Sequence, residues 1–108
     1  MARPVDISVI IPCRDAMAHL PDAIASVHAA LDGVAYEIVA ADGGSRDGTV
    51  AFLGEAGVRI ASRADSSIYD GLNKALAASS GRLVLWLNAD DRVEAPLRDL
   101  VAHALATN

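Results

Sequence analysis

Ile7-Ser8-Val9-Ile10-Ile11 is a short, β-branched and almost continuously apolar stretch that ends at Pro12. Such a stretch is typical of a strand that is buried on both faces, as strands are in parallel sheets. A second stretch of this kind covers residues 36–41 and runs directly into residues 42–49, which are too rich in glycine to be anything but a loop. The sequence therefore predicts at least two buried strands of a parallel sheet.

Helical periodicity fills the intervals between the strands. Leu20, Ile24, Val27 and Leu31 recur at helical spacing, with Pro21 suited to the first turn and Gly33 closing the segment. A short helix is predicted to begin near Thr49, and a third strand covers residues 58–62. These patterns predict that strands and helices alternate along the chain.

The second half continues the alternation. Ser66 or Ser67 is expected to cap a helix whose apolar stripe is formed by Ile68, Leu72, Ala75 and Leu76. Residues 82–87 form the clearest strand, and Pro96 opens a last helix. Trp86 in that strand and Cys13 after the first are expected to pack in the core. Alternating strands and helices with short connections specify a parallel sheet covered by helices, which is an α/β fold.

Composition bounds the class of protein. The chain has 108 residues, of which 53% are apolar, so residues 1–108 are expected to form a single domain with a real core. A net charge of -5 gives no electrostatic support to binding of nucleic acid or anionic lipid. Cys13 is the one cysteine, and neither a signal peptide nor a transmembrane segment is evident. A cytoplasmic location is the expectation.

Three polar clusters follow predicted strands. They are residues 12–15 after the first strand, 42–49 after the second and 88–91 after the fourth. Ligands of open α/β sheets bind at the carboxyl ends of the strands, so the clusters should converge on one edge. Asp90 and Asp91 offer hard oxygen ligands to Mg²⁺ or Mn²⁺, which an acidic site would need in order to bind a diphosphate. Alternatively, one of them caps the next helix, and Ser45 or Asp47 caps a helix from a solvated turn.

Common nucleotide and hydrolase motifs are missing. The loop from Gly43 to Thr49 lacks the lysine of a P-loop, and no G-x-G-x-x-G turn follows the first strand. No serine lies in a G-x-S-x-G elbow. The three histidines, His19, His28 and His103, are expected on the surface, in or beside helices and far from the strand ends.

Across nearly its whole length the chain resembles the family 2 glycosyltransferases, inverting enzymes of GT-A fold. Four segments carry the resemblance by their order and spacing: residues 7–12, residues 37–49, residues 67–75 with Ser-Ile-Tyr-Asp-Gly-Leu-Asn-Lys-Ala, and Leu87-Asn88-Ala89-Asp90-Asp91. The last is similar to the family's variant of the D-x-D motif. The resemblance implies a three-layer, mainly parallel sheet of strand order 3-2-1-4, with helices on both faces.

The resemblance also implies the ligands and their contacts. Residues expected to bind the nucleotide are Pro12, Arg14, Asp15, Asp42, Gly44, Ser45, Asp65, Asn73, Lys74 and Asp90. Asp91 is expected to contact Mn²⁺ or Mg²⁺ directly, with Asp90 facing the metal's water shell or the ribose. The donor would be a UDP- or GDP-type sugar and the acceptor a saccharide or lipid-linked hydroxyl, as in cell-envelope polysaccharide biosynthesis. Asp70 and Lys74 are equally explained as a surface ion pair at i, i+4.

Two departures and one gap accompany the resemblance. Many relatives have a second aspartate where this chain has Gly43, and an aromatic-Asn pair where it has Arg14-Asp15. The family's catalytic base and acceptor site come from a later segment, so no catalytic residue is expected before Asn108. The chain is thus expected to be the donor-binding, N-terminal part of a longer glycosyltransferase that works by direct displacement with inversion.

Other classes stay open. A non-catalytic nucleotide-binding or interaction module could keep the same fold without the chemistry. A phospho-acceptor receiver domain also has aspartates at strand ends, but Asp42, Asp90 and Asp91 do not follow its usual placement. A nucleotidyltransferase would need a glycine-rich loop directly after the first strand, where residues 12–15 stand instead.

Overall fold

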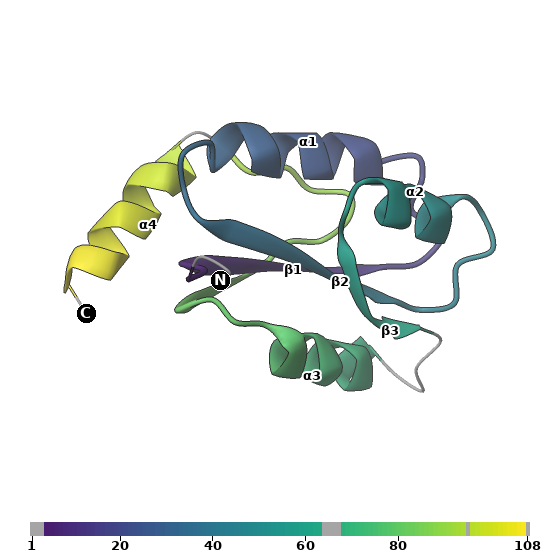
Figure 1. The fold of residues 1–108 in the computed structure, drawn as a ribbon. Helices are drawn as coiled ribbons and strands as arrows, with labels where there is room; N and C mark the ends of the chain where they lie inside the picture. Colours follow the sequence, from purple (N-terminus) through teal and green to yellow (C-terminus); the bar gives the residue numbers. More distant parts are fainter. Residues whose placement is uncertain (1–3, 64–67, 95, 108) are drawn as a thin grey trace.

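The computed structural model describes residues 4–63, 68–94 and 96–107. Strands and helices alternate along the chain, as the periodicity predicts (Figure 1). The elements are β1 (Ile7–Cys13), α1 (Leu20–Ala30), β2 (Tyr36–Asp42), α2 (Thr49–Glu55), β3 (Arg59–Arg63), α3 (Ile68–Ala78), β4 (Leu83–Trp86) and α4 (Pro96–Thr107). The expected cap at Ser66 or Ser67 lies outside the described residues.

The four strands form one parallel sheet in the order β3-β2-β1-β4. This is the expected order 3-2-1-4, and that prediction is confirmed. β1 is central, and its register pairs Ile7 with Tyr36 of β2 at one end and Cys13 with Asp42 at the other. Because all strands run the same way, the ends of β1 and β2 meet at one edge of the sheet.

Helices cover both faces of the sheet, with α1 and α2 on one side and α3 on the other (Figure 1). Successive side chains of a strand point to opposite faces, so β1 contributes to two cores. Ile7, Val9 and Ile11 pack with the apolar stripe of α1, whereas Ile10 packs with Leu72 and Ala75 of α3. This three-layer arrangement explains why β1 and β2 are apolar almost throughout.

The strand β4 is less buried than its composition predicts. Val84 and Trp86 are 50% and 51% exposed, so the expectation that Trp86 packs in the core is wrong. Both side chains lie on the α3 face, because Val84 pairs with Ser8 and Trp86 with Ile10. α3 packs against β1, β2 and β3, and among the described residues β4 pairs with β1 alone. β4 is therefore an edge strand in this structure, half open on one face.

The helices are short relative to a bilayer. Within the described ranges, no helix combines the length and the apolar character needed to cross a membrane.

Candidate functional site

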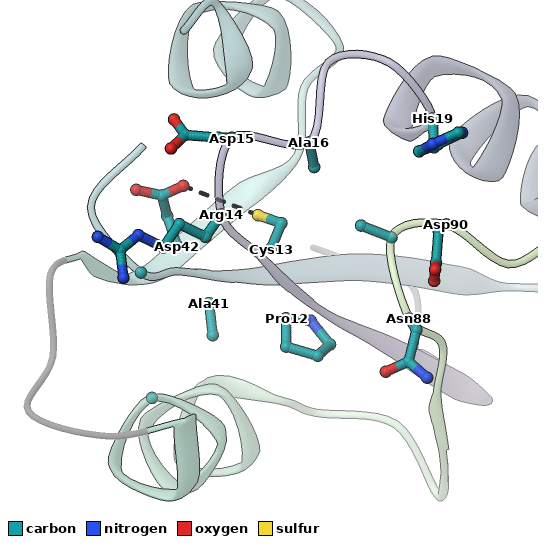
Figure 2. Close-up of a pocket in the computed structure, with 13 residues that line it drawn as sticks. Pro12, Cys13, Arg14, Asp15, Ala16, His19, Ala41, Asp42, Asn88 and Asp90 are labelled. Atoms are coloured by element: carbon teal, nitrogen blue, oxygen red, sulfur yellow. Dashed lines mark hydrogen bonds between the residues drawn. The ribbon is translucent and has the colours of Figure 1, made fainter. Parts of the chain in front are cut away.

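A pocket of about 720 Å³ opens at the carboxyl edge of the sheet, a size typical of small-molecule sites. It is lined by Pro12, Cys13, Arg14, Asp15, Ala16, His19, Ala41, Asp42, Gly43, Gly71, Asn88, Ala89 and Asp90. Figure 2 shows Asp42 and Cys13 on one side, Asn88 and Asp90 on the other, and Pro12 between them. All three polar clusters that follow β1, β2 and β4 thus contribute to one pocket.

The wall after β1 is held to the wall after β2 by backbone pairing that continues past the strands. The Gly43 amide donates to the Cys13 carbonyl at 2.8 Å. Pro12 is half-buried, whereas Arg14 and Asp15 are exposed at the rim. Arg14 places a positive charge at this rim that is suited to a phosphate group. The residues that line the pocket nevertheless include more carboxylates than cations.

Asp42, the last residue of β2, is 2% exposed, and its carboxylate is satisfied within the protein. The amides of Gly44 and Ser45 each donate to Oδ2 at 3.0 Å. The Ser45 hydroxyl donates to Oδ1, which the Cys13 thiol also approaches at 3.8 Å. A buried carboxylate requires such donors. Asp42 therefore shapes the loop as well as lining the pocket.

The Cys13 thiol is protonated in this setting. Burial and the negative charge of Asp42 raise its pKa to about 12. Since the thiolate is the reactive form of cysteine, Cys13 is a packing residue and a donor rather than a nucleophile. Its expected place in the core is confirmed by its 8% exposure.

The acidic turn after β4 places its two aspartates differently. Asn88 and Asp90 line the pocket, whereas Asp91 is not among the lining residues. The Asp91 amide donates to the Asn88 carbonyl at 3.0 Å, and the Asn88 side-chain amide lies 3.4 Å from Asp91 Oδ2. Trp86 Nε1 donates to Asn88 Oδ1 at 2.9 Å and so steadies the turn. In the described part of the chain, no group of three or more acidic, His or Cys side chains is arranged to hold a metal by itself.

Comparison with known proteins identifies the family. The model of the family described as glycosyl transferase family 2 matches residues 8–108. The chain belongs to this glycosyltransferase family.

Curated relatives of this family 2 chain come from mycobacteria. The PGL/p-HBAD biosynthesis glycosyltransferases of Mycobacterium bovis (strain BCG / Pasteur 1173P2) and Mycobacterium tuberculosis (strain ATCC 25177 / H37Ra) are each 34% identical over 97 residues. The match covers 84% of this chain and 37% of each relative. The chain thus spans little more than a third of the length of the relatives it matches.

Solved structures give the same fold. The crystal structure of Staphylococcus aureus TarS, residues 1–349, has a TM-score of 0.82 at 20% identity, and the match covers 95% of this chain and 33% of that 1–349 chain. Glucosyl-3-phosphoglycerate synthase from Mycobacterium tuberculosis has a TM-score of 0.68 at 25% identity, covering 82% of this chain and 36% of the synthase. The latter was solved with Mn²⁺, UDP and glucosyl-3-phosphoglycerate. The expected GT-A fold is therefore confirmed.

Several residues that the resemblance singles out lie away from the pocket. Asn73 and Lys74 are exposed on α3 and do not line it; Lys74 Nζ lies 3.6 Å from the Asp70 carboxylate, the ion pair that i, i+4 spacing allows. α3 instead contributes Gly71 to the lining. Gly44 and Ser45 do not line the pocket and act on Asp42 through their amides. Asp65 lies outside the described residues.

His19 is the residue that sequence reasoning missed. It stands at the start of α1 and lines the pocket, so the expectation that it lies far from the strand ends is wrong. The connection between β1 and α1 is short, which brings His19, the residue just before the helix, back to the sheet edge. That connection length was the signal in the sequence that could have found it.

Proposed function

We propose that this chain binds the nucleotide-sugar donor of a glycosyltransferase, and that the whole enzyme transfers the sugar to an acceptor hydroxyl with inversion. The observation that carries the proposal is the convergence of the clusters after β1, β2 and β4 on one pocket. Membership of family 2 supports the reaction class. The synthase solved with UDP and Mn²⁺ supports a uridine nucleotide ahead of a guanosine one.

The nucleotide is proposed to lie across the ends of β1 and β2. Pro12 and Asp42 would be near the base, and Arg14 would be near phosphate. Asp90, across the pocket, would face the ribose or the metal. Contacts from Asn73, Lys74 and Asp65 stay predictions, and those of the first two require the donor to extend beyond the pocket toward α3.

The acidic turn fits a divalent cation of the kind that nucleotides carry. Mg²⁺ and Mn²⁺ in such sites use one or two carboxylates together with substrate phosphates, so a cage of three protein ligands is not required. We propose that Asp90 and Asp91 hold Mn²⁺ or Mg²⁺, with Asp91 turning away from Asn88 to do so. The ion would supply positive charge to the departing diphosphate.

In the proposed reaction the acceptor oxygen bonds to the anomeric carbon as the bond from that carbon to the diphosphate breaks. The acceptor proton passes to a carboxylate base, which we place beyond Asn108. The acceptor would be a saccharide or a lipid-linked hydroxyl. This chain would hold the leaving group and orient the anomeric carbon.

Titration calorimetry with UDP tests the proposal. UDP should bind in the presence of Mn²⁺ and lose most of its affinity in EDTA. Asp90→Asn should weaken binding by about tenfold or more, because a neutral amide is a poorer ligand for a divalent ion. Glu55→Gln removes one charge from an exposed position on α2 and is the matched control.

Two results would count against the proposal. UDP binding that is equally tight with Mn²⁺ and in EDTA would contradict the proposed metal site. Binding by a longer form of the protein without any sugar transfer to an acceptor would favour the non-catalytic module.

A further inference from the structure

Two connecting segments at the pocket rim, residues 15–17 after β1 and residues 45–49 after β2, are cross-linked by side chains. The Asp15 amide donates to Ser45 Oγ at 2.8 Å, and the Ala16 and Met17 amides donate to Thr49 Oγ1 at 3.0 Å and Asp47 Oδ2 at 3.2 Å. In return, the Arg46 and Asp47 amides donate to Asp15 Oδ1 at 2.6 and 3.3 Å. We call this set, formed by Asp15, Ser45, Asp47 and Thr49, the loop clamp.

Asp15 has the most constrained place in the loop clamp. Its φ of 48° is in the left-handed region, which aspartate, asparagine and glycine tolerate better than other residues. One carboxylate oxygen accepts from two consecutive amides of the glycine-rich loop. The Asp15 carboxylate is thus engaged by the loop itself.

The loop clamp reaches the pocket wall through Ser45. The Ser45 hydroxyl accepts from the Asp15 amide and donates to the Asp42 carboxylate. Asp42 is buried and lines the pocket between β1 and the loop. The backbone of Asp15 is thus linked to Asp42 through one intervening hydroxyl. The Asp15 carboxylate holds the next two amides of the same loop, those of Arg46 and Asp47.

We infer that Asp15 is a positioning residue for donor binding, which holds the loop after β2 in its binding shape rather than contacting the nucleotide itself. The inference rests on the proposed function and revises the direct contact that the resemblance implies for Asp15. On this inference Arg14 and Asp90 face the donor, whereas Asp15 holds the loop after β2 in place.

Two variants of Asp15 distinguish the effect of its acceptor oxygen from the effect of its positive φ. Asp15→Asn keeps an oxygen that can accept from the Arg46 and Asp47 amides and tolerates the positive φ. Asp15→Gly also tolerates that φ but has no acceptor. The dissociation constant for UDP with Mn²⁺ should rise about tenfold in Asp15→Gly and stay within about twofold of the wild type in Asp15→Asn.

Amide exchange measured by NMR on the free proteins gives a second readout. The Arg46 and Asp47 amides should exchange about tenfold faster or more in Asp15→Gly, with amides of β1 and β2 unchanged, and near wild-type rates in Asp15→Asn. A purely structural role would lower the unfolding midpoint without changing the affinity of the folded protein.

Some outcomes would overturn the inference. Equal loss of UDP affinity in both variants, with exchange unchanged in Asp15→Asn, would mean that the charge of Asp15 acts on the nucleotide directly. Wild-type affinity in Asp15→Gly would mean that the loop clamp has no part in binding. If the wild-type chain itself binds no UDP, the proposed function fails, while the exchange rates still decide whether Asp15 holds the loop.

Discussion

Gly81, in the turn before β4, shows how a single residue limits the fold. A Cβ built there would lie 2.5 Å from the backbone nitrogen of Ser8 and 2.7 Å from its Oγ. The Gly81 amide also donates to Ser8 Oγ at 2.8 Å, and Ser8 is fully buried. The turn thus packs directly on the backbone of β1, where no side chain can be accommodated.

Gly81→Ala is therefore expected to destabilise the protein by roughly 1–3 kcal/mol, because the backbone of β1 or of the turn must shift. Gly54→Ala is the matched control, since a Cβ at this exposed position of α2 would meet nothing within 4 Å. The control should be neutral or stabilising by up to about 1 kcal/mol, as alanine favours the helix. Urea unfolding of both variants checks this. Equal stabilities would contradict the contact at Ser8.

The position of a single residue could be predicted from the sequence only where neighbouring residues of the chain determine that position. Asp42 ends one apolar strand and Asp90 lies in the short turn after another, so their place at the sheet edge could be predicted. Trp86 could not be placed, because its exposure depends on how far α3 extends over the sheet. The division of roles between Asp90 and Asp91 depends on the turn around Asn88, which no periodicity reveals.

At the scale of elements, Glu37 links β1, β2 and the turn after α3. Its Oε2 accepts from the Ser8 hydroxyl at 2.6 Å and from the Ser80 amide and hydroxyl at 2.7 and 3.1 Å. Burial acts to raise the pKa of Glu37, but these hydrogen bonds outweigh it, and the net effect lowers the pKa from its ordinary 4.5. The charged carboxylate thus joins two strands to the connection that leads into β4.

This shift sets the sign of one pH dependence. Because the folded state lowers the pKa of Glu37, the unfolded state binds more protons in acid, and the contribution of Glu37 to stability is present above pH 4.5 and lost as the pH falls through its folded value. Glu37→Gln should flatten the loss of unfolding free energy in acid and cost roughly 1 kcal/mol or less at neutral pH. Urea unfolding over a pH series measures both, with Glu55→Gln as a control for net charge. If the unfolding free energy of Glu37→Gln falls in acid as steeply as that of the wild type, the proposed contribution of the Glu37 carboxylate to stability is contradicted.

The elements themselves were predicted well because each has its own hydrophobic pattern, a continuous apolar run in the central strands and a helical period in the helices. β1 and β2 are almost continuously apolar and are buried on both faces, and the stripe of α1 is the one that packs on the sheet. The strand β4 was predicted as buried because its composition is apolar, yet it alternates between half-buried and exposed residues. Composition alone does not tell an edge strand from a central one.

At the scale of the molecule, the pocket exists because the parallel order brings together segments far apart in the sequence. It is lined together by residues 12–16, 41–43 and 88–90, which lie at or just after the carboxyl ends of strands that are neighbours in the order β2-β1-β4. The convergence of the three polar clusters on one edge follows from the alternation of strands and helices, so it could be predicted from the sequence. The hydrogen bonds of the loop clamp could not, because they depend on the conformation of two irregular segments.

Mn²⁺ as a paramagnetic probe tests the central claim most directly. In ¹H–¹⁵N spectra of the protein with UDP, replacing Mg²⁺ by Mn²⁺ should broaden amides in residues 12–16, 42–45 and 88–91 together. Amides at the opposite end of the sheet, in residues 36–38 and 56–59, should stay sharp. Broadening at that opposite end, or at one cluster without the other two, would contradict a single metal-dependent nucleotide site at the carboxyl edge.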